Sequence, residues 1–216
     1  PVADCFMQQD SRPAGTKQHI HFAGGCGPGL ERYQALAKRL AGRILTPRGF
    51  VDGELAIDEW GRVAAVTGEP VPPARARDRA GPFVLPGFVD LHVHGGGGHD
   101  VMEGGDAAEA VARLHARHGT TSLLATTMTA PSADLEAAFA GLAPHVRERP
   151  PKGARIHGVH LEGPYINPGR LGAQPDYARP LARDELKRLA AIAPTRLVTL
   201  APEVPEQVPD KGQDHV

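Results

Sequence analysis

The sequence predicts an α/β fold in which parallel βα units follow a small β domain. Strand-like and helix-like segments alternate over residues 81–201, which is typical of parallel βα units. Residues 41–80 hold only short β-like pieces bounded by glycine, proline and aspartate. A complete eight-stranded barrel needs roughly 250 residues. Because about four βα units are countable, we expect the N-terminal portion of a TIM-like (β/α)8 barrel, incomplete, after a small β portion.

The first forty residues, 1–40, have no assignable function. Leucine, tyrosine and alanine recur there at helical spacing, which predicts a helix from Leu30 to Leu40. The pair His19 and His21 follows no apolar run and is expected in a polar loop. Residues 41–80 then read as a small β domain with three short strands, "GRILTP", "GELAID" and "GRVAAV".

The βα region is predicted from apolar runs that alternate with amphipathic segments. Apolar runs of strand length predict strands, and apolar residues at helical spacing predict helices. The predicted strands are residues 82–94, 120–127, 154–163 and 196–202, and the predicted helices are residues 106–118, 132–146 and 183–193. The polar, proline-containing stretch 202–216 is expected to be a disordered tail.

Composition excludes several classes of function. The chain has 24 basic and 25 acidic residues without a long single-sign run, which argues against nucleic acid or an anionic membrane as the partner. No apolar run is long enough for a membrane span, and the first residues lack the features of a signal peptide. Only two cysteines occur, so we expect a reducing, cytoplasmic setting.

The stretch "DLHVHGGGG" carries the strongest chemical signal. His92 and His94 lie two residues apart at the end of a predicted strand, so both point to the same side. Active sites of parallel α/β barrels lie at this end, and imidazole nitrogens bind divalent metals. The alternative is that both histidines are packed and hydrogen-bonded in the core.

Glu162 ends the third predicted strand of the βα region and precedes Gly163 and Pro164. A carboxylate there faces the same edge of the sheet as His92 and His94, which favours a shared metal site over a merely solvated side chain. His157 and His160 have opposite parity on the same strand, and we expect both to be structural.

"PGFVDLHVHGGGG", "HLEGPYINPGRLGAQ" and "VTLAPE" together resemble the amidohydrolase superfamily, and within it the N-acetylglucosamine-6-phosphate deacetylases. The resemblance covers about residues 41–203 and implies that the small β domain is a β-sandwich portion. It implies metal-dependent deacetylation of N-acetylglucosamine 6-phosphate to glucosamine 6-phosphate and acetate. It also implies a homodimer for full-length members.

The resemblance also assigns site residues. Glu162 would be the principal ligand of a divalent metal, with zinc the first choice, and His92 and His94 would bind a second ion. Ala173 and Gln174 would contact the amino-sugar phosphate, although the family usually has histidine at the second of these positions. A glutamine there can donate a hydrogen bond but cannot carry a proton charge.

The family mechanism also uses two later histidine ligands and an aspartate base. After Glu162 this chain has one histidine, His215, so no catalytic base is assigned and the chain is expected to be an inactive fragment. Two alternatives stay open. One is another cyclic amidohydrolase, such as a dihydroorotase or hydantoinase, although these typically place a bridging lysine where residues 84–151 have none. The other is a degenerate, non-catalytic half-barrel.

Overall fold

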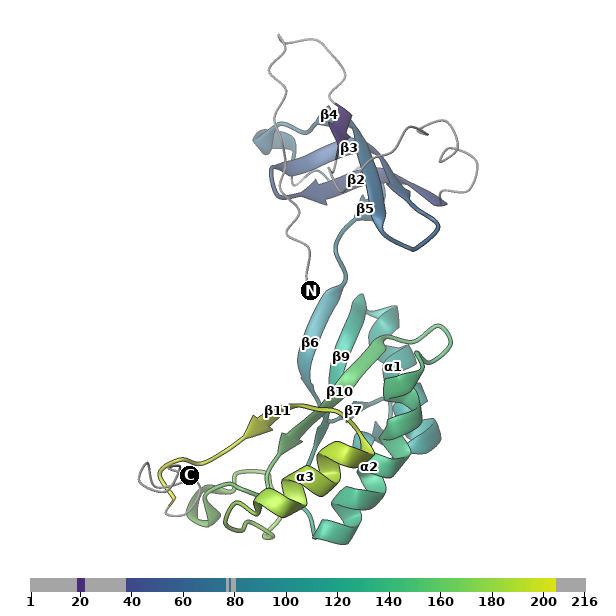
Figure 1. The fold of residues 1–216 in the computed structure, drawn as a ribbon. Helices are drawn as coiled ribbons and strands as arrows, with labels where there is room; N and C mark the ends of the chain where they lie inside the picture. Colours follow the sequence, from purple (N-terminus) through teal and green to yellow (C-terminus); the bar gives the residue numbers. More distant parts are fainter. Residues whose placement is uncertain (1–18, 22–37, 77, 79–80, 205–216) are drawn as a thin grey trace, which may run out of the picture. The chain divides into compact units, whose positions relative to one another are not determined.

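The computed structural model describes residues 19–21, 38–76, 78 and 81–204 (Figure 1). The chain divides into two compact units, Pro1–Pro86 and Gly87–Val216. Among the described residues, no helix is both long and apolar enough to cross a membrane.

The first unit contains one five-stranded sheet in the order β1-β4-β3-β2-β5. Its three long strands form an antiparallel meander, β1 pairs antiparallel with β4, and β5 pairs parallel with β2. Three buried side chains, Ile44, Val51 and Val66, form its core. The strands are β1 (His19–His21), β2 (Lys38–Thr46), β3 (Gly49–Ile57), β4 (Val63–Pro70) and β5 (Phe83–Val84).

Two expectations for the N-terminal region are wrong where the structure describes it. His19–His21 form a strand and not a loop, because their backbone pairs with Ala65–Thr67 of β4. The helix expected from Leu30 to Leu40 fails at its end, since residues 38–40 belong to β2; residues 30–37 lie outside the described part. Pairing of β2 along its whole length with β3 satisfies its backbone groups and overrides a weak helical pattern.

The second unit is built on a four-stranded parallel sheet in the order β11-β10-β9-β6, which agrees with the predicted βα alternation. Three helices connect consecutive strands. The strands are β6 (Phe88–Val93), β9 (Thr120–Thr127), β10 (Arg155–Glu162) and β11 (Thr195–Thr199). The helices are α1 (Gly105–Arg117), α2 (Ser132–Arg147) and α3 (Arg183–Ile192). Short elements lie between them: β7 (Gly95–Gly96), β8 (His99–Asp100), η3 (Val101–Glu103) and η4 (Pro168–Arg170).

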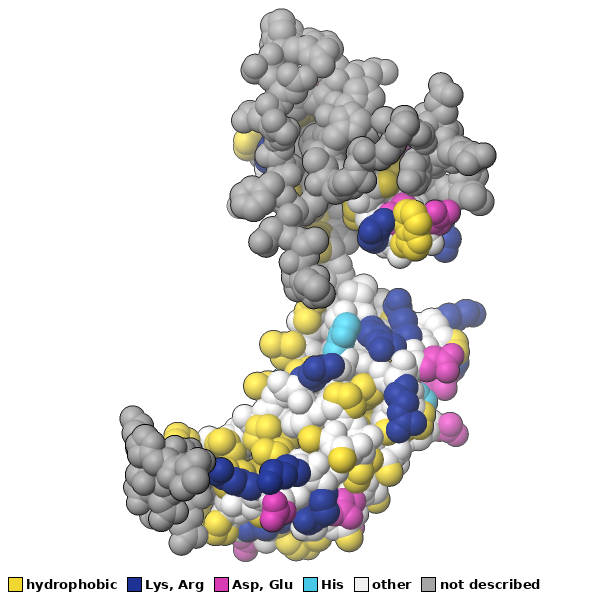
Figure 2. All heavy atoms as spheres, viewed as in Figure 1, with side chains coloured by type: hydrophobic (Ala, Val, Ile, Leu, Met, Phe, Trp, Pro, Cys, Tyr) yellow, Lys and Arg dark blue, Asp and Glu magenta, His cyan; other side chains and the backbone are white. Residues whose placement is uncertain are grey.

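The core of the second unit lies between the sheet and its helices (Figure 1). Leu123, Ile156 and Leu161 of the strands pack with Phe139 and Leu142 of α2, and all five are fully buried. The visible face of this unit carries charged side chains of both signs among apolar ones (Figure 2). The tail expected at residues 202–216 lies outside the described part of the chain beyond residue 204.

Candidate metal centre

His92 and His94 lie at the carboxyl end of β6, with their rings side by side. The ring centroids are 4.8 Å apart, and the two Nε2 atoms are separated by 2.9 Å. The His92 backbone N–H donates to Asp90 Oδ1 at 3.1 Å, a local contact within β6. Both imidazoles therefore present the same nitrogen to the same point beyond the strand.

Glu162 reaches that point from the carboxyl end of β10. Its Oε2 atom lies 2.9 Å from His94 Nε2 and 3.4 Å from His92 Nε2. Because β6, β9 and β10 are parallel neighbours, their carboxyl ends meet at one edge of the sheet. The structure thus brings together His92, His94 and Glu162, the three residues predicted from the sequence to be metal ligands. Their ligand atoms all lie within 4.8 Å of one another.

The donor set fits a divalent cation. His94 Nδ1 lies 3.0 Å from the Thr126 carbonyl oxygen, which can only accept, so Nδ1 carries a proton and Nε2 is the ring nitrogen left to bind a metal. A backbone carbonyl that holds the other ring nitrogen is the usual support of a metal-binding histidine. In tetrahedral zinc sites, bond lengths of about 2.0–2.2 Å place ligand atoms roughly 3.3–3.6 Å apart. The observed separations of 2.9–3.4 Å are close to that range.

His160, expected to be only structural, supports the histidine pair. It is buried on β10, with Nδ1 3.3 Å from Thr126 Oγ1 and Nε2 2.8 Å from Thr199 Oγ1. Its ring meets that of His92 edge-on, with centroids 5.0 Å apart. Burial, and then the neighbouring imidazole of His92, lower the pKa of His160.

Gln174 also lies at the site, and Ala173 beside it is exposed. The Gln174 amide donates from Nε2 to Glu162 Oε2 at 2.8 Å and accepts at Oε1 from the Thr129 backbone N–H at 2.7 Å. The sequence nominated this glutamine as a substrate contact and missed its bond to the carboxylate. Contact of Ala173 and Gln174 with a substrate stays a prediction.

A buried carboxylate fastens the loop that carries Gln174. Glu185 of α3 accepts from Arg179 at 2.7 Å, from Tyr165 Oη at 2.8 Å and from Ser132 Oγ at 2.5 Å. Burial alone would raise the pKa of Glu185, but hydrogen bonds from these three side chains outweigh it and lower the pKa. Burial and the Glu185 carboxylate together raise the pKa of Tyr165 far above its ordinary value.

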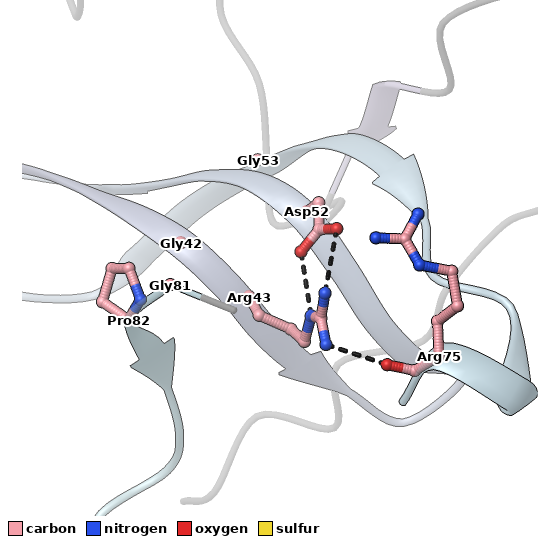
Figure 3. A pocket seen from close by; sticks show the side chains of 7 residues that line it. All are labelled: Gly42, Arg43, Asp52, Gly53, Arg75, Gly81 and Pro82. Atoms are coloured by element: carbon pink, nitrogen blue, oxygen red, sulfur yellow. Dashed lines mark hydrogen bonds and ion pairs between the residues drawn. The ribbon is translucent and has the colours of Figure 1, made fainter. Parts of the chain in front are cut away.

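The first unit has a pocket of about 280 Å³ beside another buried charge, Arg43 (Figure 3). Arg43 on β2 faces its register partner Asp52 on β3 and donates to both of its carboxylate oxygens. It also donates to the backbone carbonyls of Arg75 and Asp78. The guanidinium is therefore engaged in holding the segment after β4 to the sheet, and no residue nominated as a ligand lines this pocket.

Comparison with known proteins places the chain in a family. The model of the amidohydrolase family matches residues 83–216. The chain is 38% identical over 167 residues to N-acetylgalactosamine-6-phosphate deacetylase of Escherichia coli O157:H7, covering 76% of this chain and 43% of that protein. It is also 38% identical over 159 residues to N-acetylglucosamine-6-phosphate deacetylase of Vibrio furnissii, covering 70% of this chain and 39% of the relative.

Solved structures give the same result. A variant N-acetyl-D-glucosamine-6-phosphate deacetylase from Mycobacterium smegmatis, in complex with N-acetyl-D-glucosamine-6-phosphate, is 36% identical with a TM-score of 0.61. The match covers 77% of this chain and 44% of that one. The Thermotoga maritima enzyme is 28% identical with a TM-score of 0.64, over 78% of this chain and 43% of that chain. The fold is thus of the α/β class, with an N-terminal β-sheet portion followed by a parallel half-barrel. The chain spans less than half the length of these relatives.

Proposed function

Because the chain belongs to the amidohydrolase family, we propose that His92, His94 and Glu162 bind a divalent metal for the deacetylation of an amino-sugar phosphate. The observation that carries the proposal is the convergence of two imidazole nitrogens and one carboxylate oxygen at the carboxyl edge of the parallel sheet. Histidine nitrogens with a carboxylate oxygen suit zinc and related ions, so zinc is the first candidate, as one or two ions.

The residues of this chain prepare that site before any metal arrives. The Thr126 carbonyl holds the His94 ring, and the buried His160 ring packs edge-on against His92. Glu162 supplies the negative charge that offsets part of a divalent cation's charge. When bound, such a cation supplies Lewis-acid chemistry, because it polarises a carbonyl oxygen and makes water a stronger acid.

The proposed substrate is N-acetylglucosamine 6-phosphate, with glucosamine 6-phosphate and acetate as products. Two observations support it, the Vibrio furnissii relative and the Mycobacterium smegmatis complex, together with the resemblance of the Glu162 motif to this group. The galactosamine epimer is a second candidate, because the Escherichia coli relative at 38% identity acts on N-acetylgalactosamine 6-phosphate by its name.

Turnover requires a group that takes a proton from water and passes it to the leaving amine. The family resemblance places that base, and further histidine ligands, on later strands, whereas the last histidine of this sequence is His215. We therefore expect the 216-residue chain to bind metal without hydrolysing the acetamide.

The experiment measures metal content and acetate release on the same purified chain. After zinc loading and dialysis, we expect bound zinc by elemental analysis and no acetate above the blank from either N-acetylated sugar phosphate. A chain without affinity for zinc contradicts the proposed metal centre and favours a degenerate half-barrel. Acetate release at enzymatic rates upholds the reaction but contradicts the expectation that this chain is inactive alone.

A further inference from the structure

The Gln174 amide has only one orientation that its neighbours permit. A backbone N–H can only donate, so the oxygen atom of the amide must face Thr129 N, at 2.7 Å. The amino group is then left for Glu162, which as a carboxylate can only accept, at 2.8 Å from Oε2. The sulfur of Met128 lies 3.6 Å from the same amide nitrogen. Both polar ends of the glutamine are satisfied, and neither tolerates the flipped amide.

The loop that carries Gln174 is fastened to the segment after β9 at two neighbouring points. Gln174 bonds to the Thr129 N–H, and Arg179 donates to the carbonyl of Ala130 at 2.9 Å. Arg179 is itself held by the buried carboxylate of Glu185. The buried ionic contact between Arg179 and Glu185 therefore helps to fix the position of the loop that carries Gln174.

The bond from Gln174 ends on the oxygen atom that faces the histidine pair. Glu162 Oε2 lies 2.9 Å from His94 Nε2 and accepts from Gln174 on its other side. A carboxylate oxygen has two lone-pair directions, so one can accept from the amide while the other is directed at a metal. Without the amide, Glu162 would be free to adopt other rotamers, since its side chain is 21% exposed.

We propose that Gln174 is a positioning residue for Glu162, bridging the Thr129 backbone to the carboxylate so that Oε2 faces His92 and His94. The inference rests on the proposed metal centre, and it assigns Gln174 a role that needs no contact with substrate. A neutral histidine has one donor and one acceptor nitrogen, so it can form the same bridge. The histidine that the family usually has at this position is therefore the natural conservative variant.

The test measures zinc affinity of the full 216-residue chain by competition with a chromophoric chelator. Gln174→Met keeps the length of the side chain but removes both hydrogen bonds, and we expect zinc affinity to fall about 10- to 100-fold, as for other groups that orient metal ligands. Gln174→His should stay within about 3-fold of the native chain, because it restores a donor and an acceptor. Tyr177→Phe, on an exposed residue of the same loop, is the matched control and should bind zinc as the native chain does.

The outcomes separate this inference from the proposed function. If the native chain has no zinc affinity, the metal centre is wrong and the inference falls with it. If the native chain binds zinc and the folded Gln174→Met variant binds equally well, only the positioning role is overturned. Equal loss in Gln174→Met and Gln174→His also overturns it, because the bridge then does not matter. Should Gln174→Met fail to fold by circular dichroism, Gln174→Asn, too short to span both partners, replaces it with the same expected loss.

Discussion

The chain contains His-x-His twice, once in each unit, and the two copies lie in different kinds of strand. His19 and His21 belong to β1, a three-residue edge strand whose register partners on β4 are Thr67 and Ala65. His92 and His94 lie at the carboxyl end of β6 in a parallel sheet. The partners of the first pair carry neither imidazole nor carboxylate.

The difference teaches that the spacing of two histidines does not make a metal site. Beside the second pair lie the Glu162 carboxylate, from the strand two places along the sheet, and the Thr126 carbonyl, which holds the His94 ring. The buried His160 ring packs against His92. All of these come from residues more than thirty positions away in the sequence. The surroundings therefore distinguish the two copies, and the following variants test that distinction.

The largest expected effect comes from removing the second pair. His92→Ala/His94→Ala should lower zinc affinity at least about 1,000-fold, about 4 kcal/mol, because it removes two of the three ligand side chains. Whole zinc sites bind with about 10–16 kcal/mol, so the loss of two ligands is large on that scale. Chelator competition on the full chain measures it.

The matched control is His19→Ala/His21→Ala, which makes the same chemical change in the first unit. We expect its zinc affinity to equal that of the native chain. A comparable loss in this control would break the comparison between the two strands. A native affinity that survives the change at residues 92 and 94 would do the same.

The next effect concerns the buried charge that fastens each unit. Glu185→Ala leaves Arg179, Tyr165 and Ser132 without their shared acceptor, and breaking such a buried pair costs about 3–5 kcal/mol. In contrast, Arg43→Met leaves Asp52, whose side chain is 50% exposed and can be hydrated, so we expect about 1–3 kcal/mol. Only Glu185→Ala should also weaken zinc binding, because only Glu185 fastens the loop that carries Gln174.

Urea unfolding can follow the two units separately. Trp60, the only tryptophan, lies in the first unit, and the described α-helices lie in the second. Tryptophan fluorescence should therefore report the effect of Arg43→Met, and the helical circular dichroism signal that of Glu185→Ala. Weaker zinc binding in Arg43→Met would contradict the view that the contacts of Arg43 stabilise only the first unit.

The fold of the second unit was predictable because its signals are local. Apolar runs and helical spacing identify the helices and most strands within a few residues, and parallel strands bring their carboxyl ends to one edge. The single strand expected at residues 82–94 is wrong, since this run divides into β5, which pairs in the sheet of the first unit, and β6. The meeting of His92 and His94 with Glu162 follows from that rule alone. The sequence predicts a helical end at Lys38–Leu40 and a loop at His19–His21, and both predictions are wrong. Pairing with distant strands, and not the local pattern, makes these residues β structure.

The supporting contacts were not predictable for the same reason. Gln174 meets Glu162 only because the loop after β10 folds back and is fastened by Arg179 and Glu185. Nothing in the local sequence gives the path of that loop. Parity on the strand predicts only a structural role for His160, because its ring contact with His92 depends on the spacing of β6 and β10 across β9.

A smaller effect is expected from Thr126→Val. The Thr126 hydroxyl accepts from the backbone N–H of Val93, the residue between the two histidines, at 2.9 Å. Valine has the same shape but leaves that N–H unpaired, which costs about 1–3 kcal/mol, and it also removes the contact of the hydroxyl with His160 Nδ1 at 3.3 Å. We expect zinc affinity to fall about 3- to 10-fold, less than for the groups that bond directly to ligands.

Thr127→Val is its matched control, since it makes the same substitution at the next, equally buried residue. The Thr127 hydroxyl has only a long contact of 3.5 Å to the His160 carbonyl, so zinc affinity should not change. Equal losses in the two variants would mean that the affinity responds to general loosening of β9. In that case the Thr126 hydroxyl, with its contacts to Val93 and His160, has no special role in presenting the histidines.

The smallest expected effect is the dependence of stability on pH that comes from Glu185. Its pKa is lowered in the folded chain from an ordinary value of 4.5, so the unfolded chain binds more protons between the two values. The stability that Glu185 contributes is therefore complete above about pH 4.5 and is lost as the pH falls through the folded pKa. Urea unfolding, followed by the helical signal from about pH 6 to about pH 3, should show that the difference in free energy of unfolding between the native chain and Glu185→Gln shrinks as the pH falls.

Glu203→Gln is the control, because Glu203 also has a lowered pKa, through its hydrogen bond from Asn167. This variant should keep most of the native dependence of unfolding free energy on pH. A constant difference between the native chain and Glu185→Gln over this range would mean that the carboxyl contributes through packing alone.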